Sequence, residues 1–163
     1  MRVIIGLAFL GLVVALAFWR GGKPEKLFAA VLLAMLVLDR IGHGLLHHDR
    51  PAAIEALHLT IDLTSFVSMM AVMIYARRFW PIWACSFQLL SVSTYPLLVL
   101  DARLPTVVQT MLAVAPNYLI NATLLVGIVC HQVRLRRFGS DPSWRTSSPR
   151  ATTRTPRRTL RRF

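Results

Sequence analysis

Five long apolar runs, separated by short polar segments, make up most of this chain. Each run has roughly 17 to 25 residues, the length that an α-helix needs to cross ~30 Å of hydrocarbon. The pattern therefore predicts an all-α fold, a polytopic membrane helix bundle with about five transmembrane helices. Their expected positions are residues 3–19, 27–47, 52–76, 81–100 and 106–130.

Two of the predicted helices contain a proline, Pro96 in the fourth and Pro116 in the fifth. A proline removes a backbone donor and clashes with the preceding turn, so we expect both helices to kink. The first run contains the triplet Ala15-Leu16-Ala17, which looks like a signal-peptide cleavage site. That run is long for a cleaved signal, and a basic cluster follows it directly, so we expect a retained helix.

The end of the chain has a different composition. Residues 139–163 are rich in Arg, Ser, Thr and Pro and have no periodic apolar face. We therefore predict a transmembrane domain of residues 1–138 followed by a disordered, basic cytoplasmic tail.

Most of the net charge lies near this tail. From His131 to Phe163 there are ten Arg and one Asp, which supply +9 of the formal net charge of +12. A basic segment beside a bilayer attracts anionic lipid, at ~1 kcal/mol per basic residue. We therefore expect the lipid bilayer, with anionic lipid at the tail, as the partner, and other membrane proteins as further candidates. Nucleic acid is the less favoured partner.

The basic residues of the short connections predict the orientation, because loops rich in Lys and Arg stay in the cytoplasm. One set of connections carries Arg20, Lys23 and Lys26, then Arg77 and Arg78, then Arg134, Arg136 and Arg137. The opposite set carries only single arginines, Arg2, Arg50 and Arg103. If the N-terminus lies outside and the C-terminus in the cytoplasm, every connection rich in Lys and Arg lies in the cytoplasm. We therefore expect a multi-pass protein of the bacterial inner (plasma) membrane with this orientation.

An aromatic and basic segment follows the third run, Ala76-Arg77-Arg78-Phe79-Trp80-Pro81-Ile82-Trp83. Its aromatic side chains are expected in the belt where lipid meets water. Together with Phe87-Gln88-Leu89-Leu90, this segment resembles small uncharacterised inner-membrane proteins of alphaproteobacteria. The resemblance implies an inner-membrane location and carries no activity and no site residue with it.

Ionisable residues gather where the second predicted helix meets the third. Asp39 and His43 are four residues apart and share a helix face, and Glu55, His58 and Asp62 follow the i, i+3, i+7 spacing of a single stripe. The turn between the two helices is short, so they should be antiparallel. Asp39 would then lie near the depth of the stripe, in the outer half of the bilayer.

A charge at the centre of a bilayer costs ~2.5 to 3.5 kcal/mol, so these groups should face the bundle interior or water. With neutral histidines, three acids against Arg40 leave a balance of −2. Glu55-Ala56-Leu57-His58 has the E-x-x-H spacing of helical carboxylate metal sites, although those sites use two such pairs.

Three interpretations of the stripe stay open. The first is a site for a divalent metal ion or haem formed by Asp39, His43, Glu55, His58 and Asp62. The second is a proton-relay or quinone-linked site. The third is purely structural, with Arg40 in an ion pair with an acid of the third helix and the histidines joining helices.

Other polar residues are weaker candidates. Those on the fourth and fifth helices are expected mainly as hydrogen bonds between helices, and otherwise as the lining of a cavity. These are Gln88, Ser91, Ser93, Thr94, Gln109, Asn117, Asn121 and Thr123. His131, at the cytoplasmic end of the last helix, is expected to be an interfacial residue. Cys85 and Cys130 lie in apolar runs and form no metal motif.

The sequence has no nucleophile beside a base, no phosphate loop and no dinucleotide fingerprint. An enzyme is therefore not the favoured class. The leading hypothesis is a small integral inner-membrane protein whose His and carboxylate cluster binds a metal ion or haem, or relays protons. Its alternatives are a non-catalytic scaffold or accessory subunit and, in a third class, a phage-type holin.

Overall fold

The computed structural model describes residues 2–45, 51–76, 78–100, 105–139 and 141. This part of the chain is all-helical, as the hydrophobic pattern predicted. Its five helices are α1 (Arg2–Arg20), α2 (Lys23–Leu45), α3 (Pro51–Tyr75), α4 (Trp80–Leu100) and α5 (Thr106–Phe138).

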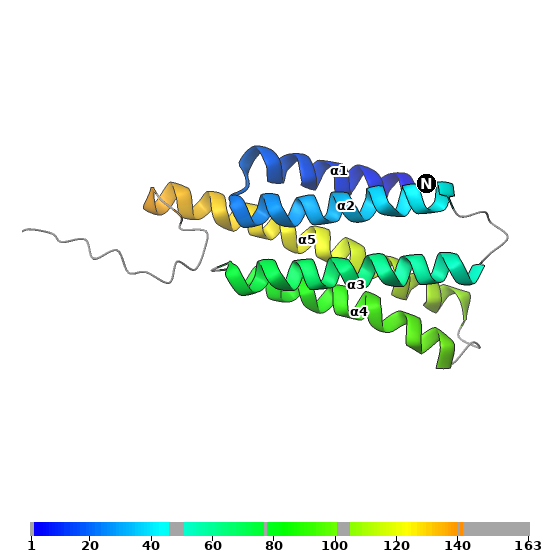
Figure 1. Ribbon diagram of the computed structural model, residues 1–163. Helices are drawn as coiled ribbons and strands as arrows, with labels where there is room; N and C mark the ends of the chain where they lie inside the picture. The colour runs from blue at the N-terminus through cyan, green and yellow to red at the C-terminus, as the bar shows by residue number, and fades with distance from the viewer. Residues whose placement is uncertain (1, 46–50, 77, 101–104, 140, 142–163) are drawn as a thin grey trace, which may run out of the picture.

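The helices form a closed ring in the order of the sequence (Figure 1). Each helix contacts its neighbours along the chain, α1 contacts α5 to close the ring, and α2 contacts α5 across the middle. Consecutive helices are antiparallel. The α1–α2 link, the α3–α4 link and the end of α5 therefore lie together at one end of the bundle, which we call the basic end. The opposite end, with Asp39 and His58, is called the cavity end.

Three predicted helix ranges agree with the structure to within one residue, those of α1, α3 and α4. The second helix begins four residues earlier than expected, at Lys23. Pro24 occupies its first turn, where the missing N–H has no helical partner to lose.

The fifth helix continues eight residues beyond its apolar run, to Phe138. Two arginines in its last turn are favourable beside the negative end of the helix dipole. Gly139 ends the helix in the left-handed conformation, with φ 68°, and its N–H donates to the Leu135 carbonyl over 3.0 Å.

Both prolines lie inside continuous helices, since α4 runs through Pro96 and α5 runs through Pro116. The predicted tail lies outside the described residues except for Gly139 and Asp141. Asp141 is held against the bundle, as the site description below explains.

Within the described part of the chain, three helices are long and apolar enough to cross a membrane, Lys23–Leu45, Ala53–Tyr75 and Thr110–Phe138, and Ile4–Arg20 is a shorter apolar helix. Large apolar side chains also cover the outside of the bundle, among them Ile4, Leu12, Trp19, Val67 and Phe79. So much exposed apolar surface is typical of contact with lipid rather than water. The helices are those of a membrane protein.

The buried apolar core is densest towards the basic end. There the Trp80 ring packs edge-on against Phe28, with ring centroids 5.0 Å apart. Gly127 allows this, because a Cβ at that position would lie 2.7 Å from the indole. Buried core residues come from every helix and include Val13, Ala17, Leu32, Met69, Val72, Ala84, Ile120, Leu124 and Ile128.

Candidate functional site

A cavity of about 1780 Å³ lies between the helices and is lined by residues of all five. This volume exceeds the ~300 to 1,000 Å³ of ordinary small-molecule pockets. Most of the wall is apolar. The polar lining residues are Asp39 and Arg40 from α2, Glu55, His58 and Asp62 from α3, Ser91, Thr94 and Tyr95 from α4, and Thr110, Asn117, Tyr118 and Asn121 from α5.

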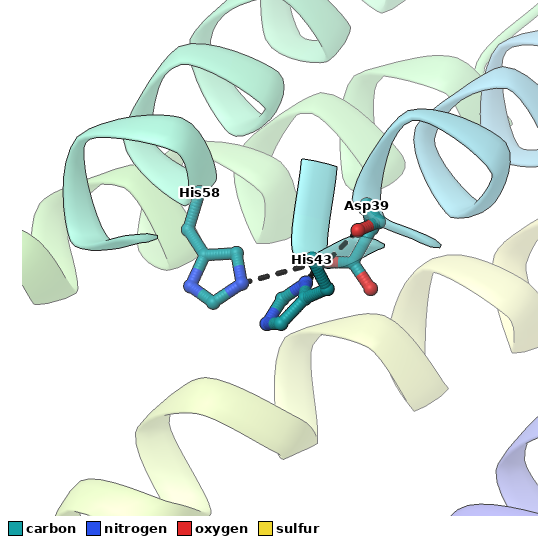
Figure 2. A group of neighbouring side chains, drawn as sticks. All are labelled: Asp39, His43 and His58. Carbon is teal, nitrogen blue, oxygen red and sulfur yellow. Dashed lines mark hydrogen bonds and ion pairs between the residues drawn. The ribbon is translucent and has the colours of Figure 1, made fainter. Parts of the chain in front are cut away.

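Asp39 and His58 line this cavity, and His43 converges with them (Figure 2). Nε2 of His58 lies 3.2 Å from Oδ1 of Asp39, and Nδ1 of His43 lies 3.5 Å from the same oxygen. The two imidazole rings have centroids 5.0 Å apart. One ligand atom from each residue lies within 4.8 Å of the other two.

The antiparallel pair of α2 and α3 brings these residues together. Asp39 and His43 are one turn apart on α2, and His58 faces them from α3. The two helices approach closely at Gly42, where an added Cβ would run into the side chain of Leu57. Nδ1 of His43 donates to the backbone carbonyl of Asp39 over 2.9 Å, which fixes the ring against its own helix.

The distances of the two imidazole nitrogens from the carboxylate oxygen suit a small metal ion. Zinc–nitrogen and zinc–oxygen bonds of ~2.0 to 2.1 Å in a tetrahedral site place neighbouring ligand atoms ~3.3 Å apart. The two distances to Asp39 Oδ1 are 3.2 and 3.5 Å. The side chains are 33 to 39% exposed, so an ion could reach the cluster without the helices separating.

Two other residues of the predicted site lie elsewhere. Glu55 is exposed and lines the cavity, but it is not among the three converging residues. Arg40 is also exposed, and among the described residues it forms an ion pair with neither Glu55 nor Asp62. Successive helix residues are 100° apart, so the turn of α2 that directs Asp39 towards His58 directs Arg40 elsewhere.

Asp62 belongs to a separate network. It is 5% exposed and accepts hydrogen bonds from three side chains of α4. Gln88 Nε2 donates to Oδ1 over 3.0 Å, while the Tyr95 and Ser91 hydroxyls donate to Oδ2 over 2.8 and 3.2 Å. Asp62 is one helical turn beyond His58, ~6 Å along the axis, which carries it past Asp39.

Some polar residues of α4 and α5 form hydrogen bonds between helices, and others line the cavity, which are the two roles expected from the sequence. Gln88 and Ser91 hydrogen-bond Asp62 across the α3–α4 interface. Thr94 and Asn121 line the cavity. The Ser93 and Thr123 hydroxyls instead donate to backbone carbonyls of their own helices.

A second polar cluster, at the basic end, was not singled out from the sequence. Arg78 is the centre of it, with a side chain that is 1% exposed. Its guanidinium lies 3.8 Å from the Glu25 carboxylate and 2.6 Å from the Asp141 carboxylate. Glu25 is 0% exposed and also accepts a hydrogen bond from the Trp80 indole over 3.3 Å. We call Glu25, Arg78, Trp80, His131 and Asp141 the basic-end cluster.

His131 and Arg134 hold Asp141 from the side of α5. Nδ1 of His131 lies 2.6 Å from Asp141 Oδ2, and Nε of Arg134 lies 3.4 Å from it. Burial by itself would raise the pKa of Asp141. The hydrogen bonds from Arg78 and His131, together with the charges of Arg78 and Arg134, outweigh burial and lower that pKa to about 2.

This cluster corrects two expectations. Trp80 does not join an aromatic belt, because it is 7% exposed and hydrogen-bonded to Glu25, whereas Phe79 and Trp83 are exposed. His131 is 7% exposed and paired with Asp141 rather than interfacial. One sequence signal was available, since a glycine two residues before Asp141 can turn the chain back at the end of a helix.

Comparisons of the chain with protein-family models, with curated proteins and with solved structures found no match. The functional argument therefore rests on the geometry of the two clusters and of the cavity.

Proposed function

We propose that this protein is a small integral membrane protein that binds one divalent transition-metal ion through Asp39, His43 and His58. The observation that carries the proposal is the convergence of one carboxylate and two imidazoles within 4.8 Å, beside a cavity between the helices. Two imidazoles and a carboxylate form a donor set suited to zinc and to other divalent ions late in the first transition series.

A single ion fits this site better than haem does. A haem iron with two histidine ligands needs one imidazole on each face of a porphyrin. The His43 and His58 rings are 5.0 Å apart by centroid, tilted by 37°, and both adjoin the same carboxylate. No plane the width of a porphyrin could pass between them without moving α2 away from α3.

Binding would rearrange the hydrogen bonds of the site. In the metal-free protein, imidazole N–H groups hold Asp39. An ion at the same position would take the nitrogen lone pairs instead, so each neutral ring would carry its proton on its other nitrogen, and His43, bound through Nδ1, would give up its hydrogen bond to the Asp39 carbonyl. Protonated imidazoles cannot bind the ion, so metal uptake is expected to weaken on acidification. Structural joining of helices is the competing explanation, because His58 and Asp39 also connect α3 to α2.

The test is a zinc titration of the purified, chelator-stripped protein by calorimetry. We expect one ion per chain, and we expect His58→Ala to lose binding while the helical circular dichroism is kept. His131→Ala is the matched control for the loss of one imidazole, because His131 lies in the basic-end cluster, and its helical circular dichroism is compared in the same way to exclude unfolding. Equal zinc binding by His58→Ala and the unaltered protein would reject the site, and a metal-free protein that binds no zinc would leave only the structural role.

We also propose the orientation in the bacterial inner membrane. All five helices would span it, with the N-terminus outside, and the basic end, with Arg20, Lys23 and Arg134, would face the cytoplasm. Anionic lipid would contact the tail. Reporter fusions after Arg78 and after Arg137 should read cytoplasmic and one after Arg50 periplasmic. A periplasmic reading after Arg137 would contradict five spans.

A further inference from the structure

The cavity contains a carboxylate, that of Asp62, which no cation of the described residues neutralises. Asp62 is 5% exposed, and its three side-chain partners Gln88, Ser91 and Tyr95 are all neutral donors. Among the described residues, no Lys, Arg or His lies within ion-pair distance of it. A buried charge left without a counter-charge costs several kcal/mol, more so inside a membrane bundle.

A second observation, on α5, also points to a missing donor. Asn121 of α5 is 8% exposed and lines the same cavity. Its Nδ2 donates to the Asn117 carbonyl over 2.9 Å, whereas its Oδ1 is buried without a hydrogen-bond partner in the described part of the chain. A buried carbonyl oxygen of this kind needs an N–H or O–H group.

The charge of the lining selects the sign of a ligand. The lining contains three acids, Asp39, Glu55 and Asp62, and one cation, Arg40, so its net charge is −2 with neutral histidines. The remainder of the wall is largely apolar and is built from all five helices, with Leu10, Leu36, Met111 and Val114 among its members. The acidic lining would repel an anionic ligand, and the largely apolar wall would not match a fully polar one.

We propose that the cavity binds a primary ammonium group carried on an apolar chain. The ammonium would neutralise Asp62 and donate to Asn121 Oδ1, since an –NH₃⁺ group offers three N–H donors. The chain would lie along the apolar wall between α1, α2 and α5. A free long-chain amine and the headgroup of phosphatidylethanolamine share this chemistry. The inference requires the membrane location proposed above but not the metal site, because it depends on Asp62 and Asn121 instead.

The test uses the full-length protein in phosphatidylcholine nanodiscs with a chelator present. Radiolabelled dodecylamine is equilibrated against nanodiscs with and without protein, beside dodecanol and dodecyltrimethylammonium. We expect saturable binding of one amine per chain, no saturable binding of the alcohol, and weaker binding of the quaternary ion, which has no N–H. Phosphatidylethanolamine added to the nanodiscs should compete if the lipid is the natural source and should not if a free amine is.

Two variants locate the bound amine. Asp62→Asn keeps the shape of the side chain and should weaken dodecylamine binding roughly thirtyfold or more, as expected when one partner of a desolvated ion pair is removed. Ala115→Trp should fill the apolar part of the cavity and block binding without touching an acid. If Asp62→Asn does not fold, Glu55→Gln at an exposed lining position should still lower affinity several-fold.

The outcomes separate this proposal from the metal site. His43→Ala should abolish zinc binding and leave dodecylamine binding in place, because His43 belongs to the metal cluster and is not among the residues that line the cavity. Equal binding of the amine and the alcohol, or unchanged amine binding in Asp62→Asn, would overturn the proposal and leave a non-selective apolar cavity. Loss of zinc binding alone in a site variant would not affect it.

Discussion

Histidine, carboxylate and arginine side chains occur at both ends of the bundle, but their burial and their ion pairs differ. At the basic end, Arg78, Glu25 and Asp141 are each at most 5% exposed, and the guanidinium lies against both acids. At the cavity end, Asp39, His43 and His58 are about one-third exposed, with no arginine among their ion pairs. The first cluster is closed and, with Arg134 beside Asp141, carries no net charge with a neutral His131, while the second is open and carries the single charge of Asp39.

This difference separates a structural role from a binding role. In a buried cluster whose acids lie against an arginine, removal of the arginine leaves an unpaired buried charge, although Glu25 Oε2 and Arg78 Nε have no hydrogen-bond partner in the described residues. An open cluster beside a cavity contributes less stability, because its groups are about one-third exposed. Substitutions of the same residue types are therefore expected to destabilise the fold at the basic end and to remove ligand binding at the cavity end.

The largest effect is expected for Arg78→Ala. The substitution leaves Glu25 and Asp141 buried without their cation, which should lower the free energy of unfolding by ~3 to 5 kcal/mol. Denaturant unfolding in detergent measures it. Arg136→Ala, at an exposed position of the same end, is the control and should change stability by less than ~0.5 kcal/mol. Equal effects of the two would show that the basic-end cluster is not structural.

A glycine pair gives the next largest contrast. A Cβ on Gly22 would lie 2.8 Å from Glu25 Oε2 and 2.9 Å from His131 Cε1. Gly22→Ala should therefore cost ~1 to 3 kcal/mol of stability by overpacking the basic end. Gly44→Ala, near the cavity end, meets no atom within 4 Å and should be neutral or stabilising by up to ~1 kcal/mol through helix propensity. The same thermal unfolding assay measures both, and a tolerated Gly22→Ala would mean that the basic end is loosely packed.

The pH dependence of stability tests Asp141. Its pKa is lowered from 3.8 to about 2 in the folded protein, so the folded form favours the ionised carboxylate. The stabilisation should be complete above about pH 4 and should disappear as the pH falls towards 2. Asp141→Asn should thus be less stable than the unaltered protein at pH 6, with a difference that shrinks at pH 2.5. A constant difference at both values would argue against the ion pairs.

The smallest stability effect is expected at the cavity end. His58→Ala removes one half-exposed contact between α2 and α3 and should cost only ~0.6 kcal/mol in the absence of metal. Saturating zinc should stabilise the unaltered protein and leave His58→Ala unchanged. A loss of several kcal/mol without metal would assign His58 to the structural class.

Hydropathy located the helices well because the length of an apolar run is set by the bilayer. It missed the polar end of α5, since residues from His131 to Phe138 are helical without being apolar. Helix formation depends on backbone propensity and capping, whereas hydropathy reports contact with lipid.

Within the site, the sequence predicted only part of what the α2–α3 pair determines. The approach of Asp39 to His58 follows from a short turn and an antiparallel neighbour, whereas Glu55 and Arg40, on the same two helices, do not join the cluster. The role of Asp62 did not follow, because its partners come from α4 and depend on the order of helices around the ring. Glu25 and Arg78 are far apart in the sequence, and no local pattern joins them. The metal and the topology stay predictions.

Zinc-edge X-ray absorption spectroscopy of the protein loaded with one equivalent of zinc tests the central claim most directly. It identifies the atoms bound to the ion. The account predicts two imidazole nitrogens and a carboxylate oxygen at ~2.0 to 2.2 Å, with loss of zinc uptake in His58→Ala. A shell of oxygen atoms without imidazole scattering, or an identical spectrum from His58→Ala, would contradict a metal site at Asp39, His43 and His58.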